Sequence, residues 1–257
     1  MTVAQIDELF AQTLTGDYDE DAPWEAVGKL RNLGTHQVYE RAAEWCISND
    51  PLKRARGADV LAQIGRTSEH AQNNFLAESY AVVSQLAQHE KEPLPLLAAI
   101  HALGHIGNPL ALPLVIQNCS HEDANVRFAV ACALGKFADE PRAVQGLIAL
   151  MGDRDEHVRD WATFGLGVLG DADSSEIRAA LLKRTDDPNP DVREEAIVAL
   201  ANRKELRAIP TLIAELNHGT VSDRLREAAD SFLGESEQHE TWDGNDFAKA
   251  LSLRFPA

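Results

Sequence analysis

Hydrophobic and polar positions follow one helical pattern that recurs about every 32 residues along the chain. Four positions after the starting position of a repeat stands a residue that is small in most repeats. Leucine follows at eight positions, and an aliphatic or aromatic residue follows at eleven positions. These spacings place the three side chains on one face of a helix. The starting positions are Ala22, Lys53, Pro95, Val126, Val158, Val192 and Leu225. The pattern predicts seven helices that each bury the same face.

Residues at the expected helix ends agree with this register. Three positions before the start, six of the seven repeats have Asp, Asn or Ser, which are preferred N-cap residues; Asp19 is the first of them. Twelve positions after the start, glycine suits the left-handed backbone that ends many helices. The glycines are Gly34, Gly65, Gly107 and Gly170, while Ala138 and Lys204 occupy this position in two other repeats.

A second amphipathic segment follows each turn. The clearest of these segments span residues 109–118, 141–151, 175–183 and 209–216. Each repeat is therefore predicted as two antiparallel helices, and no strand-like alternation of useful length occurs. We expect an all-α solenoid over residues 1–257, with repeats in 18–235. Residues 1–17 and 236–257 are expected to form caps, because the end faces of a solenoid are apolar.

Three of the repeats carry a family resemblance. The segments 123–127, 155–159 and 189–193, with the alanine and leucine positions that follow them, resemble the HEAT repeats of the phycobilin-lyase type, and the resemblance covers roughly residues 18–235. It implies a right-handed α-solenoid of about seven HEAT-like helix pairs, with first helices on the convex side and second helices lining the concave side. It does not imply one activity, since such repeats occur in scaffolds, adaptors and a few enzymes.

The charge balance argues against polyanionic partners. The chain has 24 basic and 41 acidic residues, a formal net charge of −17, so neither nucleic acid nor an anionic membrane is an expected partner. Residues 1–50 hold ten acidic and three basic residues, whereas residues 51–152 hold nine and eight. An anionic ligand is therefore expected in the middle of the chain.

Membrane insertion and secretion are not expected. The segment from Pro93 to His121 has no charged residue, but prolines interrupt it and it keeps the repeat pattern, which favours a buried central repeat over a membrane span. The start of the chain is polar, unlike a signal peptide. Cys46, Cys119 and Cys132 are odd in number and unclustered, which is typical of reduced thiols in a cytoplasmic protein.

Arginine recurs one position after the helix start. It forms either a row of cations for an anionic partner or, as the regular repetition favours, structural ion pairs with acids near the N-caps. The residues are Arg54, Arg127, Arg159, Arg193 and Arg226, and the candidate acids are Asp123, Asp155, Glu156, Asp187 and Asp191.

No metal or cofactor is predicted. His101 and His105 are four residues apart, one expected to be half-buried and the other exposed, but no third ligand stands at a fitting spacing. The His-Glu pairs at 89–90, 121–122 and 239–240 invite comparison with di-iron deoxyhypusine hydroxylases, yet they fall in turns and in the C-terminal tail. A base-flipping glycosylase would use tryptophans, here Trp24, Trp45, Trp161 and Trp242, but would need a basic channel.

We therefore predict a non-enzymatic scaffold or adaptor that binds a protein partner. Its concave surface is expected to include outward residues of the second helices, namely Pro113, Gln117, Gln145, Arg178, Thr211 and Ala214. About ten extra residues in repeat two, around 66–78, supply a further candidate contact with His70 and Phe75. The alternative is an accessory subunit of a tetrapyrrole lyase or another enzyme, with a ligand-sized pocket beneath this insertion.

Overall fold

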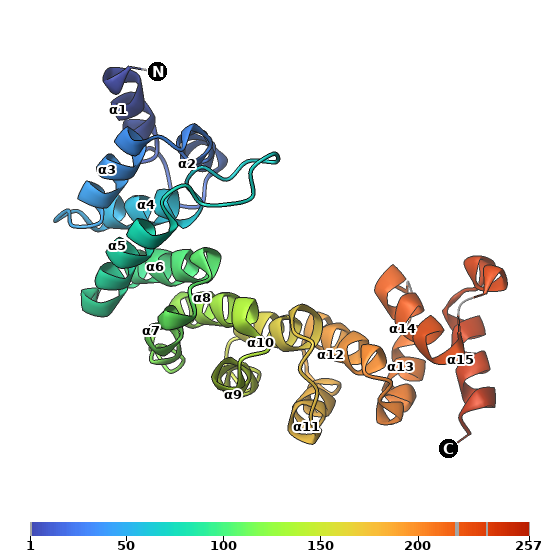
Figure 1. The fold of residues 1–257 in the computed structure, drawn as a ribbon. Helices are drawn as coiled ribbons and strands as arrows, with labels where there is room; N and C mark the ends of the chain where they lie inside the picture. The colour runs from blue at the N-terminus through green and yellow to red at the C-terminus, as the bar shows by residue number, and fades with distance from the viewer. Residues whose placement is uncertain (1, 219–220, 235, 257) are drawn as a thin grey trace. The chain divides into compact units, whose positions relative to one another are not determined.

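The computed structural model describes residues 2–218, 221–234 and 236–256, and in these residues it contains helices, turns and loops but no strand (Figure 1). The chain divides into two compact units, Met1–Phe137 and Ala138–Ala257, which are described separately. An all-α solenoid of seven helix pairs is confirmed. The predicted boundary at residue 235 lies outside the described residues.

The first helices begin close to the predicted starting positions. They are α2 (Asp21–Leu33), α4 (Pro51–Ala62), α6 (Pro93–Ile106), α8 (Ala124–Leu134), α10 (Glu156–Phe164), α12 (Pro190–Asn202) and α14 (Asp223–Leu233). The second helices are α3 (His36–Trp45), α5 (Leu76–His89), α7 (Leu112–Ile116), α9 (Pro141–Leu150), α11 (Ser175–Arg184), α13 (Ile209–Leu216) and α15 (Gly244–Arg254). One further helix, α1 (Val3–Gln12), precedes the pairs and packs on α2, burying Ile6 and Phe10.

Side-chain caps start most of the first helices as predicted. Each capping oxygen accepts a hydrogen bond from a backbone N–H of the first turn, which has no partner within the helix. The capping residues are Asp50, Asp123, Asp155, Asn189 and Ser222. The prediction for Asp19 is wrong, because α2 begins two residues later and its N-cap, Glu20, makes no side-chain cap bond.

Glycine ends two first helices as predicted, because Gly34 and Gly107 are the C-caps of α2 and α6 with φ angles of 53° and 68°, in the left-handed region. Gly65 is also left-handed, with φ 82°, but it lies in the turn beyond α4, whose C-cap is Gln63. Gly170 is extended instead, with φ −106°, because α10 continues into a π-helical turn over Gly165–Leu169. The Arg203 guanidinium donates hydrogen bonds to the carbonyls of Leu166 and Gly167, which satisfies groups that a left-handed end would otherwise satisfy.

Within residues 2–137 the first helices form a closely packed row. Helix α6 contacts both α4 and α8 extensively, whereas α3, α5 and α7 pack mainly on the following first helix and little on each other. A Cβ added to Gly104 would lie 2.8 Å from the Cα of Ala133, so this contact depends on glycine. The implied assignment of first helices to the convex side and second helices to the concave side stays a prediction.

In residues 138–256 helices α12 to α15 close one end of the repeat array. Ile209, Leu212, Phe232, Phe247 and Leu251 belong to one buried cluster there. Helix α15 packs on both α13 and α14, so it is the second helix of the seventh pair and also covers the apolar end face.

The uncharged central segment is part of this helical array. Most of α6 is buried, including Ile100 and Leu103. None of the helices in the described residues is long and apolar enough to cross a bilayer. Cys46, Cys119 and Cys132 are not disulfide-bonded, and burial raises the pKa of the Cys46 and Cys132 thiols to about 12.

Candidate functional site

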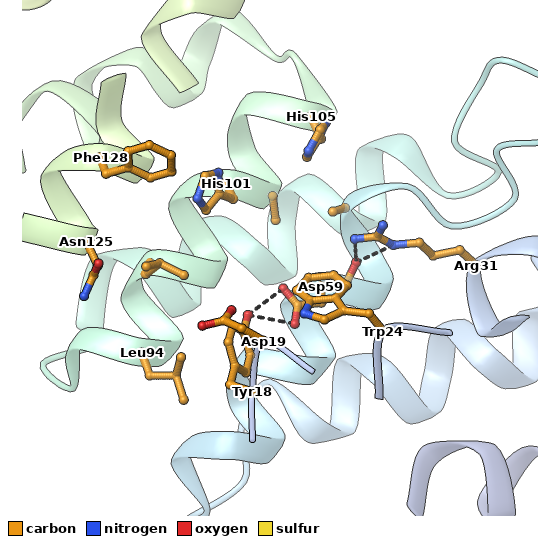
Figure 2. Close-up of a pocket in the computed structure, with 13 residues that line it drawn as sticks. Tyr18, Asp19, Trp24, Arg31, Asp59, Leu94, His101, His105, Asn125 and Phe128 are labelled. Atoms are coloured by element: carbon orange, nitrogen blue, oxygen red, sulfur yellow. Dashed lines mark hydrogen bonds between the residues drawn. The ribbon is translucent and has the colours of Figure 1, made fainter. Parts of the chain in front are cut away.

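A hollow of about 520 Å³ lies on the first-helix side of residues 2–137. It is lined by four consecutive first helices and by the loop that precedes α2 (Figure 2). The lining residues include Tyr18, Asp19, Trp24, Arg31, Asp59, Leu97, His101, His105, Asn125 and Phe128. A volume of this size with mixed apolar and polar walls is typical of ligand-binding or peptide-binding pockets.

The repeat register explains which side chains meet in the hollow. Residues at the same position of successive repeats form rows across the neighbouring first helices. One row, two positions after the start, contains Trp24, Leu97 and Phe128. The next row, at position six, contains Asp59 and His101. The last row, at position ten, contains Gln63, His105 and Lys136.

A buried arginine lies beside the hollow. Arg56 is 1% exposed, and its guanidinium donates to the carbonyl oxygens of Thr13 and Tyr18 at 2.9 and 2.7 Å and to Asp59 Oδ2 at 3.3 Å. It also lies 4.1 Å from the centre of the Tyr18 ring, a cation–π contact. All these bonds fix the loop before α2 against α4, so Arg56 is a structural cation.

Asp59 is held by the same network. Tyr18 Oη donates to both carboxylate oxygens of Asp59 at 2.9 and 3.0 Å (Figure 2). Burial raises the pKa of Asp59 to about 6, although Tyr18, Arg31 and Arg56 each lower it. Burial and the neighbouring Asp59 raise the pKa of Tyr18, so this hydroxyl stays protonated and remains a donor. The carboxylate is therefore occupied by structural partners.

Arg31 links Asp59 to the polar side chains at the other end of the hollow. Its Nε and Nη2 donate to the carbonyl oxygen of Asp59 at 2.9 and 2.7 Å, and its Nη1 donates to Gln63 Oε1 at 3.4 Å. Gln63 Nε2 lies 2.8 Å from His105 Nδ1. Because arginine can only donate, the Gln63 oxygen accepts, and Gln63 Nε2 therefore donates to His105. The remaining nitrogen of neutral His105, Nε2, then carries the proton.

The two histidines are neutral in this setting. Burial lowers the pKa of His101 to about 4. Desolvation lowers the pKa of His105 to about 4 as well, with further lowering by Arg31, His101, Lys136 and Arg66. As predicted, His101 is half-buried and His105 is exposed at its outer edge. Among the described residues no three His, Cys, Asp or Glu side chains are placed to hold a metal ion.

The recurrent arginines are structural, as their repetition favours. In four repeats Nη1 donates to carbonyls five and six residues earlier, in the turn that precedes the first helix; these are Arg54, Arg127, Arg159 and Arg193. Arg54 also pairs with Glu90, Arg159 with Asp187, and Arg193 with Glu215. Asp187 is among the acids expected from the sequence.

The His-Glu pairs considered for di-iron chemistry and the tryptophans considered for base flipping make structural contacts. Glu90 pairs with Arg54 and His89 Nδ1 donates to the Gln85 carbonyl, while His121 Nδ1 accepts from the Asp123 backbone N–H. His239 pairs with Asp230 in the other unit. Of the four tryptophans, Trp24 lines the hollow, whereas Trp45 packs on Phe10 and Trp242 on Phe247.

The site residues expected from the sequence lie elsewhere, and their role stays a prediction. Gln117 is exposed just after α7, Gln145 Nε2 donates to Glu176, Arg178 pairs with Asp173 and Glu205, and Thr211 is half-buried on α13. None of these residues lines the hollow. What sequence reasoning missed is the first-helix face. A usable signal was Arg56, which stands where the next two repeats have Ala98 and Ala129.

The insertion of repeat two is anchored both to repeat one and to α4 of its own repeat. Asn74 Nδ2 donates to the Gly34 carbonyl at 2.9 Å, and Asn73 Nδ2 donates to the Leu61 carbonyl at 2.9 Å. Phe75 stacks on Tyr39 with ring centres 4.9 Å apart, while His70 is exposed. Figure 1 shows the insertion as the long loop between α4 and α5. Its base therefore has a structural role, and its tip is accessible.

The comparison with known families agrees with the repeat geometry. Residues 80–167 and 146–232 each match the family described as HEAT repeats. The chain belongs to the HEAT-repeat family. This assignment covers more than half of the sequence and confirms the resemblance seen in the repeats.

Known relatives of this HEAT-repeat protein include YibA of Escherichia coli (strain K12). YibA is 29% identical over 229 residues, which are 87% of this chain and 79% of YibA. The X-ray structure of YibA superimposes with a TM-score of 0.72 at 25% identity, covering 97% of this chain and 93% of YibA. The phycocyanobilin lyase subunit alpha of Picosynechococcus sp. is 29% identical over 146 residues, which are 56% of this chain and 53% of that subunit.

A designed armadillo repeat protein, solved in complex with the peptide (KR)4, shares the fold. Its TM-score is 0.51 at 16% identity, covering 76% of this chain and 98% of the designed chain. At this level of identity the similarity concerns the fold alone.

Proposed function

We propose that this HEAT-repeat protein is a non-enzymatic scaffold that holds a segment of a partner protein in the hollow of residues 2–137. The observation that carries the proposal is the state of the ionisable groups there. Asp59 is occupied by Tyr18 and Arg56, and His101 is neutral and lies among apolar groups. A general acid or base needs a proton-transfer group that faces substrate near its working pKa. The hollow instead presents fixed walls for recognition.

The lining supports binding of a polypeptide segment. Trp24, Leu97 and Phe128 offer apolar area, and Asn125 at the rim is an exposed hydrogen-bonding group. Aromatic side chains with a surrounding polar rim are typical of the centres of protein interfaces. A designed armadillo repeat protein of the same fold was solved in complex with the peptide (KR)4, and this supports peptide binding as a use of such a repeat array.

Site-specific photo-crosslinking in the native host tests this proposal. A photoreactive amino acid at Leu97 is expected to give a protein adduct, which a second substitution, Asn125→Trp, reduces by about tenfold because indole at the rim fills the hollow. Asn202→Trp, an exposed asparagine of α12, is the matched control and leaves the adduct unchanged. A photoreactive residue at Leu253, which is 76% exposed on α15, reports non-specific labelling. Adducts of equal yield at Leu97 and Leu253 contradict the proposal.

A second candidate function is an accessory role in tetrapyrrole attachment. It is favoured by the presence of a ligand-sized hollow together with the similarity to a phycocyanobilin lyase subunit. Addition of phycocyanobilin to the purified chain, followed by visible absorbance, distinguishes the two functions. A spectral shift that Asn125→Trp abolishes and Asn202→Trp does not would support the accessory role over the scaffold.

A further inference from the structure

One end of the hollow is cationic in a chain that is strongly acidic as a whole. Arg31 lines this end, and its guanidinium has no carboxylate partner within hydrogen-bond distance among the described residues. After the bonds to the Asp59 carbonyl and Gln63, each terminal nitrogen retains one N–H without a partner in that part of the chain. These donors are available to an anion in the hollow.

Other cations cluster at the same end. The row at position ten contains Gln63 just after α4, His105 in α6 and Lys136 in the turn after α8. Arg66 follows Gln63 by three residues. The strongest charges acting on His105 are cationic and include Arg31, Lys136 and Arg66. His105 Nε2, which carries the proton when Nδ1 accepts from Gln63, adds a neutral donor. The opposite end, with Tyr18, Asp19 and Asp59, has no comparable excess of positive charge.

The apolar wall begins directly beside these donors. The Arg31 guanidinium carbon lies 5.7 Å from the centre of the Trp24 ring. A group that contacts both must carry its anionic and apolar parts within about one residue of each other. The C-terminal residue of a polypeptide meets this condition, because its carboxylate and side chain share one Cα. It also adds a single negative charge, whereas a run of acidic residues would be repelled by a chain of net charge −17.

From this arrangement we propose that the hollow binds the C-terminal residue of a partner chain, with the terminal carboxylate at Arg31 and an aromatic or branched apolar side chain against Trp24. The inference rests on the proposed function in that it names the part of the partner that enters the hollow. Arginine suits this role because its planar N–H groups match the geometry of a carboxylate.

The test compares two probes that differ in one group. N-acetyl-L-tryptophan carries the carboxylate, and N-acetyl-L-tryptophanamide replaces it with a neutral amide of nearly the same shape. Titration of the full-length ¹⁵N-labelled protein is expected to give about tenfold tighter binding of the acid, since one charge-assisted contact contributes roughly that factor. Shifts are expected at Trp24, Arg31 and His105. Equal affinities for the two probes would overturn the proposal.

Charge-matched variants test the cationic end without disturbing the buried network. Arg66→Gln with Lys136→Gln removes two exposed cations near His105, and the acid is expected to bind about fivefold more weakly while the amide is unaffected. Arg142→Gln with Lys249→Gln removes two exposed cations from residues 138–256 and is the control, with no change expected. An equal loss in both double variants would show only a long-range charge effect and would contradict the proposed contact.

A last pair of probes identifies the source of the carboxylate. A glycine-serine pentapeptide that ends in tryptophan is expected to bind, and its C-terminally amidated form is expected to bind about tenfold more weakly. An amidated peptide with an internal glutamate beside tryptophan should resemble the weak form. If this third peptide binds as well as the first, a side-chain carboxylate is recognised and the chain-end assignment is wrong. If crosslinks at Leu97 persist while acid and amide bind equally, the scaffold function stands and the carboxylate inference alone fails.

Discussion

At the residue scale, buried polar groups stabilise the fold through hydrogen bonds. Arg56 is nearly inaccessible and stabilises the loop before α2 through two carbonyls and one carboxylate. Removing one partner of such a network typically costs about 3–5 kcal/mol, because the remaining charge is left buried and unpaired. The same burial leaves His101 neutral, which links the stability of the fold to pH.

His101 is expected to make the protein less stable in acid. Its pKa is lowered by burial from 6.5 to about 4 in the folded state. Between these values the unfolded chain binds more protons, so the free energy of unfolding falls as the pH falls, by up to about 3 kcal/mol from this group. We expect His101→Phe to have the same free energy of unfolding as the parent chain at pH 7. Between pH 7 and 4.5 the free energy of unfolding of this variant should fall by about 2 kcal/mol less than that of the parent chain. Urea unfolding at several pH values measures the difference.

The exposed His70 provides the control for this comparison. His70→Phe should follow the pH dependence of the parent chain, because this side chain is exposed and is not part of the buried network. Asp59 and the other titrating groups are common to all three proteins and cancel in the comparison. A pH dependence of His101→Phe indistinguishable from that of His70→Phe would show that His101 is not the responsible group.

At the element scale, small residues set the distance between helices. The helix starts, most caps and the second helices at 141–151, 175–183 and 209–216 could be predicted because they depend on local sequence and on a repeated apolar pattern. The π-helical turn after α10 could not, because it depends on Arg203 reaching back from the next repeat. A left-handed end was expected at Gly170, and tertiary hydrogen bonds replaced it.

Two glycines in helix interiors should respond oppositely to the same substitution. A Cβ on Gly57 would lie 2.6 Å from the Ala42 carbonyl oxygen in α3, whereas a Cβ on Gly28 in α2 would have no neighbour within 4 Å. We expect Gly57→Ala to lower the free energy of unfolding by about 1–3 kcal/mol through overpacking. Gly28→Ala should raise it by about 0.5–1 kcal/mol, because alanine restricts the unfolded chain and favours the helix. Thermal and urea unfolding of the two variants checks both signs; destabilisation by Gly28→Ala would contradict this account.

At the scale of the whole molecule, the fold follows from the sequence more directly than the site does. The repeat register places Gln63, His105 and Lys136 at one position and so contains the row that becomes the cationic end. It does not reveal that Tyr18 bends over Asp59, because that contact comes from a loop outside the repeat. Arg66, His105 and Lys136 come from the near-neutral middle of the chain, whereas Arg31 comes from the acidic first fifty residues. The expected second-helix residues follow from the concave side that the resemblance implies, and none of them lines the hollow.

A solenoid distributes its stability among neighbouring repeats, so damage to its last helix should stay local. Leu251 is fully buried on α15 against α13 and α14, while Leu253 on the same helix is 76% exposed. We expect Leu251→Ala to cost about 3 kcal/mol and Leu253→Ala less than about 0.5 kcal/mol. Hydrogen exchange should show lost protection in α13 to α15 and unchanged protection in α4 and α6. Equal loss throughout the chain would mean that the repeats unfold as one cooperative unit, so that closing the end face with α15 stabilises the hollow of residues 2–137 as well.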